Sequence, residues 1–483
     1  MAAIILIYTG MISLGRWQLD EFDRFRSMRA DPNFLETRLR WSPRPIGEVL
    51  YYIYGWLVNY FHKPLIIPFL GLLWAIFLAA GMLTYWQKRH RLQENQASQY
   101  LLLALCLMVL FLSGHGITEV FYWPAGAVAY LPTLAATFLL FLQITSGSLA
   151  TSSGRTLAGC CLFVAAGTSE CGAAFVFFYA LIQGARWVSV CSRRHKTRFR
   201  RSQWWWVAPG LIAVLVLLCV RMNRLNVIEF PEMQASPVRG HPLTSLVVGM
   251  IEMVVELAGK DTLLRLSANH SVSQLFPELL SSRLPMEILL ATGVALCWSR
   301  LPRVRKEVAS RIREVIGALL LASLCTIAEA SLHFGFVCCD RHECLRECWM
   351  VMCIAGLAIS SSARITPERF RQRAKYSFLG PLILCVAVLP LLHPQLLFRT
   401  YRDYASVRRS REENFQAGFQ ADARQMVFSV VPSTGVIVEE PIKPGTYTLL
   451  PGKNVEFTIG NYPYIILEFF GKQNIVVKPC QLP

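Results

Sequence analysis

Acidic residues cluster near the N-terminus, directly after the first apolar segment of the chain. The run Leu19-Asp20-Glu21-Phe22-Asp23 holds three carboxylates within four residues. A carboxylate at the edge of a membrane is partly desolvated, which raises its pKa and makes it a better general base. The alternative is an acidic helix cap at the boundary between lipid and water, and the spacing alone leaves both interpretations open.

A candidate phosphate-binding residue follows in the run Trp41-Ser42-Pro43-Arg44-Pro45. The two prolines stiffen the backbone on either side of Arg44. A guanidinium group in a fixed position suits a phosphate or pyrophosphate, because it offers paired donors. An arginine that contacts lipid headgroups would give the same pattern.

Further polar residues stand at the ends of apolar segments. His115 and Glu119 are four residues apart, so on a helix they would share one face. Tyr122 suits either stacking on a sugar ring or the aromatic belt of a membrane protein. Glu170 stands between two short apolar segments, and Glu329 lies inside another one. Ionisable groups at membrane depth are functional by default, and a structural ion pair is the alternative for Glu329.

Residues 338–348 are rich in groups that bind metals or form disulfides. Their cysteines and His342 could bind zinc, although the spacing differs from the usual paired arrangement. Disulfides are favoured in an oxidising compartment. We therefore predict at least one disulfide and no zinc in this run. Arg341 and Arg346 are two more candidate phosphate ligands.

The composition indicates a membrane protein. Of 483 residues, 54% are hydrophobic and 16% are charged, whereas soluble domains have about 45–50% apolar and about 25% charged residues. These values exclude a disordered chain, a disulfide-rich mini-protein and most soluble enzymes. We expect about eleven spanning helices, at roughly 1–15, 64–86, 98–113, 125–145, 156–168, 172–190, 204–222, 285–299, 314–337, 349–363 and 377–398. The apolar segment 243–257 contains Glu252 and Glu256, and we interpret it as interfacial or re-entrant.

The distribution of basic residues predicts the topology. The net charge is +17, and the Lys and Arg residues concentrate in alternate connections, at about 87–97, 146–155, 191–203, 300–313 and 364–376. The connections 114–124 and 168–171 contain neither residue. This asymmetry predicts a cytoplasmic N-terminus. It also explains the basic runs as topology signals, so we expect no nucleic-acid partner.

This topology places three long segments outside the membrane, at 16–63, 223–284 and 399–483. Within the first, the aromatic and amphipathic stretch 46–61 suits a helix at headgroup level. The last begins with a charged helical stretch, 399–424, and continues as a β-unit of about 55 residues. Its expected strands are 426–431, 436–438, 446–450, 455–459, 464–470 and 475–477. We therefore predict a mainly α protein, with a polytopic helical bundle at 1–398 and an extracytoplasmic C-terminal domain at 399–483.

Taken together, these features resemble the bacterial GT-C type membrane glycosyltransferases, in particular the branch around the O-antigen-modifying glucosyltransferases. The resemblance covers most of the chain as architecture, and each of its motifs is short. The acid pair here is Asp-Glu where the family has Asp-Asp. The residues that carry the resemblance are Asp20-Glu21, Trp41–Pro45, Thr118–Trp123, Gly167–Glu170 and the tail from Tyr464 to Ile475.

The resemblance implies transfer of a sugar from a polyprenyl-phosphate carrier to a glycan or lipid-linked acceptor, on the outer face of the bacterial inner (plasma) membrane. Some relatives use a divalent cation, and no other cofactor is implied. The implied base is Asp20, with Glu21 as its orienting partner or substitute. Substrate-binding roles fall to Arg44, Trp41, His115, Glu119, Tyr122, Glu170, Arg341 and Arg346.

Two other classes of function stay open. A transporter or flippase of lipid-linked sugars would use Glu119, Glu170 and Glu329 as a polar path, but we find no internal repeat of the kind that transporters often have. A non-catalytic partner in polysaccharide assembly would keep the architecture with a degenerate site. Transfer of label in proteoliposomes distinguishes the three classes.

The topology is testable by cysteine-accessibility labelling. A cysteine introduced at Ser202, in the basic connection 191–203, should be labelled only from the cytoplasmic side. A cysteine at Ser410, in the C-terminal segment, should be labelled only from the opposite side. A tail that is labelled from the cytoplasm would contradict both the topology and the glycosyltransferase hypothesis, because the acidic run would then face the wrong compartment.

Overall fold

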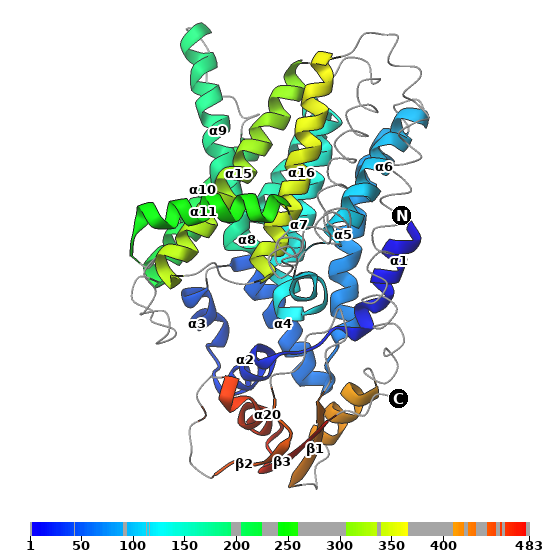
Figure 1. Ribbon diagram of the computed structural model, residues 1–483, viewed down its shortest axis with the longest axis vertical. Helices are drawn as coiled ribbons and strands as arrows, with labels where there is room; N and C mark the ends of the chain where they lie inside the picture. The colour runs from blue at the N-terminus through cyan, green and yellow to red at the C-terminus, as the bar shows by residue number, and fades with distance from the viewer. Residues whose placement is uncertain are drawn as a thin grey trace, which may run out of the picture.

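The protein is a mainly helical bundle with a small sheet at one end, as the computed structural model shows (Figure 1). The structure describes residues 2–42, 44–89, 94–112, 114, 116–194, 204–224, 240–258, 306–335, 340–365, 409–419, 424–430, 442–450, 455 and 459–479. The expected helices 285–299 and 377–398, and the expected strand 436–438, lie outside these residues, as do 456–458 of the strand expected at 455–459 and 399–408 of the expected charged helical stretch.

Six of the described helices are long and apolar enough to cross a membrane, so the chain is a multi-pass membrane protein. They are α5 (Ile66–Arg89), α7 (Pro124–Thr145), α9 (Glu170–Arg194), α10 (Trp204–Arg224), α15 (Lys306–Phe334) and α16 (Asp340–Ile365). The expected segments 1–15, 98–113 and 156–168 are also helical but shorter or less apolar. They form α1 (Ala2–Gly10) with the 3-10 turn η1 (Met11–Leu14), α6 (Glu94–Phe111) and α8 (Ser152–Thr168).

Helix α7 occupies the centre of the bundle. All of its residues are buried, and it packs against α5, α8, α15 and α16. A helix that is apolar on all sides can be buried all round, and α7 contains no charged residue. The short π-helical turn η2 (Thr118–Tyr122) ends two residues before the first residue of α7, Pro124, and packs against α7.

Three shorter helices, α2 (Leu19–Ala30), α3 (Phe34–Trp41) and α4 (Pro45–Phe61), lie together at one end of the bundle (Figure 1). We call this the α4 end. Helix α4 buries a polar and aromatic face and exposes an apolar one, with Ile53, Trp56 and Tyr60 between 48% and 67% exposed. This exposed aromatic face agrees with the expected helix at headgroup level.

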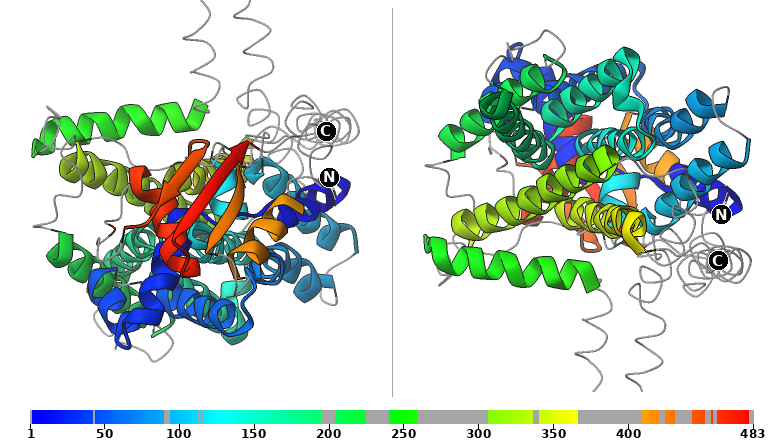
Figure 2. Two further views of the ribbon diagram at one scale, coloured as in Figure 1. Left: turned by 90° about the horizontal axis from the view of Figure 1, so that it is seen from below. Right: turned by 90° about the horizontal axis from the view of Figure 1, so that it is seen from above.

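The C-terminal unit contains a three-stranded sheet in the order β1-β3-β2. Strand β1 (Gln425–Val430) runs parallel to β3 (Asn474–Pro479), and β2 (Gly445–Thr448) runs antiparallel to β3. The sheet covers the α4 end of the bundle when this end is viewed from below (Figure 2). The strands expected at 426–431, 446–450 and 475–477 are confirmed as β1, β2 and β3.

The strand expected at 464–470 is wrong, because this segment forms helix α20 (Tyr462–Phe470). Pro463 stands in its first turn, and Gly471 ends it with a left-handed φ of 65°. The apolar residues of this segment recur at helical spacing, but a run this short is also compatible with a strand. The buried positions that show this spacing are Tyr462, Ile465, Ile466, Phe469 and Phe470.

The cysteine-rich run is also different from expectation. The expected helices 314–337 and 349–363 leave this run as a connection between them. Instead, it is helical from Asp340 onward and forms the first part of α16. Cys344 and Cys348, which are buried and four residues apart, are not joined in a disulfide, so this pair does not supply the disulfide predicted for the run. Cys338 and Cys339 lie outside the described residues.

Helix α11 (Pro242–Ala258) crosses α15 and α16 instead of running along them (Figure 1). Its exposed face is apolar, with Leu243 80% and Val254 65% exposed. On its other face Glu256 forms a fully buried ion pair with Arg346 of α16, with 2.7 Å between Arg346 Nε and Glu256 Oε1. This pair joins α11 to the bundle.

Removing one partner of this pair should destabilise the protein strongly. We expect Arg346→Met to lower the free energy of unfolding by about 3–5 kcal/mol, because Glu256 would remain buried without a counter-charge. The double variant Arg346→Met with Glu256→Leu should recover most of that loss. Thermal unfolding in detergent measures both effects. Unchanged melting of the single variant would mean that the pair does not hold α11.

Candidate functional site

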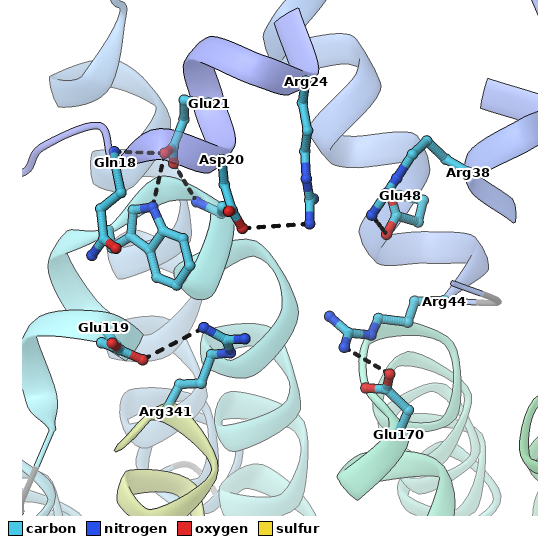
Figure 3. Close-up of polar contacts among 12 residues, drawn as sticks. Gln18, Asp20, Glu21, Arg24, Arg38, Arg44, Glu48, Glu119, Glu170 and Arg341 are labelled. Carbon is cyan, nitrogen blue, oxygen red and sulfur yellow. Dashed lines mark hydrogen bonds and ion pairs between the residues drawn. The ribbon is translucent and has the colours of Figure 1, made fainter. Parts of the chain in front are cut away.

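Charged side chains from five helices and η2 gather at the α4 end of the bundle (Figure 3). Four acidic and four basic groups form ion pairs there. The pairs are Asp20–Arg24, Glu48–Arg38, Glu170–Arg44 and Glu119–Arg341. The structure thus brings together five of the residues singled out in the sequence: Asp20, Arg44, Glu119, Glu170 and Arg341.

Asp20 lies in the first turn of α2, one helical turn before Arg24. Its Oδ2 atom is 3.6 Å from Arg24 Nη2, and 27% of its side chain is exposed. Burial lowers the pKa of Arg24, but Asp20, Tyr51 and Glu48 act together in the opposite direction, so the pKa is raised overall. Asp20 is therefore a carboxylate beside a fixed positive charge, and it can be reached from solvent.

Glu21 has a different environment, because its side chain is fully buried. Its Oε2 atom accepts hydrogen bonds from the backbone N–H of Gln18 at 2.7 Å and from the indole N–H of Trp123 at 2.9 Å. Its Oε1 atom accepts the backbone N–H of Ala125 at 3.0 Å. With three protein donors on its two oxygens, Glu21 orients α2 against the start of α7, which disfavours the alternative that it substitutes for Asp20 as the base.

Arg44 caps the N-terminus of α4 and forms the shortest ion pair of the site. Its Nη2 atom donates to Glu170 Oε1 at 2.6 Å, and its guanidinium carbon lies 5.9 Å from the ring centroid of Tyr130. Glu170 is held at the start of α9, two residues after α8 ends at Thr168. The start of α4 lies close to the end of α8, which allows this pair to form. Glycine permits this approach, because a Cβ atom on Gly47 would lie 2.9 Å from the carbonyl oxygen of Thr168.

Glu119 in η2 faces Arg341 in the first turn of α16, with 3.6 Å between Oε2 and Nη1. Burial raises the pKa of Glu119, and the charge of Arg341 opposes that rise. The Arg341 guanidinium also lies 5.2 Å from the ring centroid of Trp123. Gly116, with a φ of 63°, allows η2 to approach α16, because a Cβ atom there would lie 2.6 Å from the carbonyl oxygen of Asp340.

Arg24 and Arg38 complete the site and were missed in the sequence. With Arg44 they supply one guanidinium group each from α2, α3 and the start of α4. Burial lowers the pKa of Arg38, and the positive charges of Arg24 and Arg44 lower it further. Arginine remains protonated at neutral pH, so Arg38 keeps its positive charge close to those of Arg24 and Arg44, and a bound anion would offset part of this charge. The sequence signal was weak, because these residues stand among several other arginines.

Some of the expected site residues do not reach this cluster. Tyr122 is 3% exposed, and its hydroxyl donates to the carbonyl oxygen of Tyr8 at 2.9 Å, so it lies in the core. Arg346 is buried in its pair with Glu256. His115 lies outside the described residues, and the structure describes Trp41 only as the last backbone position of α3.

The ion pairs differ in how firmly they are made. Three of them have N···O distances of 3.5–3.6 Å, which is longer than an ordinary charge-assisted hydrogen bond of about 2.7–2.9 Å. Only Arg44–Glu170 reaches 2.6 Å. A guanidinium has five N–H donors, more than one carboxylate takes up, so this arrangement suits a phosphate beside a carboxylate that can accept a proton.

In the part of the chain that the structure describes, no group of three or more His, Cys, Asp or Glu side chains could hold a metal ion.

Comparison with known proteins adds no relative: no family model, no curated protein and no solved structure matches the chain. The geometry of the α4 end is therefore the basis for assigning a function.

Glu21 should make the stability of the protein depend on pH. Its burial raises the pKa from the ordinary value of 4.5 to about 7, while its three hydrogen-bond donors act in the opposite direction. The folded state therefore binds this proton more tightly than the unfolded state does. The stabilisation that protonated Glu21 gives the folded state is complete below about pH 4.5 and is lost as the pH rises through about 7. A full shift of this size corresponds to about 3 kcal/mol.

We expect Glu21→Gln to reduce the pH slope of the unfolding free energy between about pH 4.5 and 7 by close to one proton. At low pH the amide should cost about 1–3 kcal/mol, because it presents a donor to the N–H of Ala125. Chemical unfolding across this pH range measures both effects. The matched control is Glu36→Gln, whose side chain is 60% exposed. An equal slope in wild type and Glu21→Gln would contradict the raised pKa.

Proposed function

We propose that the protein is a membrane glycosyltransferase that moves a sugar from a polyprenyl-phosphate carrier to a glycan or lipid-linked acceptor, with its active site at the α4 end. One observation carries this proposal: the partly exposed carboxylate of Asp20 is paired with Arg24, in a cluster that also contains Arg38 and Arg44 from the next two helices. A base and a group of cations are the two things that transfer from a phosphate-linked sugar requires.

In the proposed reaction, Asp20 accepts the proton of the acceptor hydroxyl while the oxygen of that hydroxyl forms a bond to the anomeric carbon of the donor sugar. The bond between that carbon and the phosphate oxygen breaks, and its electron pair leaves with the polyprenyl phosphate. Arg24, Arg38 and Arg44 stabilise the charge that develops on this leaving group. The proton on Asp20 then passes to water.

The surroundings of the site support a lipid-linked donor. The exposed aromatic face of α4 suits the headgroup region of a bilayer, and the buried face of the same helix contributes Glu48 to the charged cluster. A carrier whose hydrocarbon chain stays in the membrane would present its phosphate at this level. Glu119, Glu170 and Arg341 are then placed to bind the hydroxyl groups of the sugar. In the proposed topology this end faces away from the cytoplasm.

Replacing the proposed base should slow transfer without unfolding the protein. We expect Asp20→Asn to reduce turnover by about 10²–10⁴-fold, because the amide keeps the shape of the side chain but cannot accept the proton. The assay is transfer of label from a polyprenyl-phosphate sugar to an acceptor in proteoliposomes. The matched control is Asp31→Asn at the other end of α2, which should stay within about threefold of wild type.

A second variant tests the leaving-group site. Arg38→Gln should lower kcat/KM for the donor by about 10- to 100-fold, because one guanidinium that faces the phosphate is lost. Near-normal transfer by both Asp20→Asn and Arg38→Gln would refute this assignment. Label that crosses the bilayer without joining an acceptor would instead favour a flippase, and the absence of both activities would favour an assembly partner.

A further inference from the structure

Helix α2 presents different residues to its two sides. One side carries Asp20 and Arg24, which face the charged cluster (Figure 3). The other side carries Phe22, Arg26 and Arg29, which contact the C-terminal unit. An isolated helix of about 12 residues is marginal in water, and α2 has 12 residues, six of them charged. Its position therefore depends on what holds it from outside.

Helix α20 supplies the first set of contacts. Arg26 forms ion pairs with Asp23 of its own helix and with Glu468 of α20. Arg29 Nη1 donates to the carbonyl oxygen of Phe469 at 2.7 Å, and its guanidinium carbon lies 4.4 Å from the centroid of the Phe469 ring. Two adjacent residues of α20 thus bind two arginines that are nearly one helical turn apart on α2.

An aromatic cluster fills the space beside these polar contacts. Trp17 stacks edge-to-face with Phe22, Phe415 and Phe469, with ring centroids 5.1–5.7 Å apart. Phe22 and Phe469 are themselves 5.4 Å apart. Such pairs add about 0.5–1.5 kcal/mol each beyond the area that they bury. The cluster joins the start of α2 to both helical parts of the C-terminal unit.

The helix at 409–419 fixes the chain just before α2. Arg411 Nη1 donates to the carbonyl oxygens of Leu14 and Gly15. These residues end η1 and lead into α2, so Arg411 holds the segment from which α2 starts. On the opposite side, Glu21 anchors α2 to α7 through Trp123 and Ala125.

We infer that the C-terminal unit is a positioning element that holds α2 against α7 and thereby sets the place of Asp20 in the site, with Glu468 and Phe469 as its positioning residues. This inference rests on the proposed function. Neither residue faces the charged cluster, so their effect on the reaction passes through α2. A shift of about 1 Å in a reacting group can cost on the order of 10²-fold in rate, so a modest loosening of α2 would be visible in turnover.

The test uses the full-length protein and two separate measurements. Glu468→Gln removes the ion pair with Arg26 and keeps the size of the side chain. We expect hydrogen exchange of the amides in 19–30 to quicken by roughly three- to tenfold, and kcat to fall by about tenfold with the donor KM within about twofold. Glu468→Asp keeps the charge and should restore most of both. The matched control is Tyr447→Phe, which removes a hydrogen bond to the carbonyl of Lys443 within the C-terminal unit.

The outcomes separate this inference from the proposed function. Exchange in α2 that stays at the wild-type rate in Glu468→Gln overturns the inference, and so does faster exchange with unchanged kcat. A KM effect without a kcat effect also overturns it, because that would mean a role in donor binding. A wild-type protein that transfers no sugar refutes the proposed function and with it the role in catalysis, while the exchange measurement still decides whether Glu468 holds α2.

Discussion

The carboxylate of Glu21 joins the parts of this molecule on which everything else depends. It binds the backbone at the start of α2, and it also binds Trp123 and Ala125 at the start of α7. Because α7 is buried along its whole length, it cannot move without disrupting the packing of the bundle. Helix α2 is fixed to α7 by these hydrogen bonds on one side and held by the C-terminal unit on the other, so both sets of contacts determine where Asp20 lies. A fully buried acid is costly, and three donors to two oxygens offset much of that cost.

The bundle could be predicted because its signals are strong and local. An apolar run of about 20 residues specifies a spanning helix with little help from tertiary contacts, and α5, α7, α9 and α10 were expected close to their observed bounds. The short C-terminal elements were harder. Residues 464–470 are apolar and bounded by proline and glycine, so strand and helix were both compatible with them, and packing on α2 decides between the two.

The site could be predicted only where a residue stood out from its neighbours. Asp20, Arg44, Glu119, Glu170 and Arg341 were singled out by an unusual local setting, and the fold brings them together. Arg24 and Arg38 had no such setting in the sequence. The fold places them close to each other and to Arg44, and this proximity is what makes them part of the site. Arg346 and Tyr122 were singled out in the same way, but both are buried. Their partners, Glu256 and the carbonyl group of Tyr8, are distant in sequence, so the sequence did not reveal these contacts.

Gly47 and Gly116 have a consequence for genetics. Neither carries a side chain that could touch a substrate, yet each marks a place where two segments meet so closely that a single methyl group would push them apart. At Gly47 the segments carry Arg44 and Glu170, and at Gly116 they carry Glu119 and Arg341. An unbiased screen for inactive alleles should therefore recover alanine at these two positions as readily as changes in the charged residues, and suppressors should map to the opposing backbone near Thr168 and Asp340.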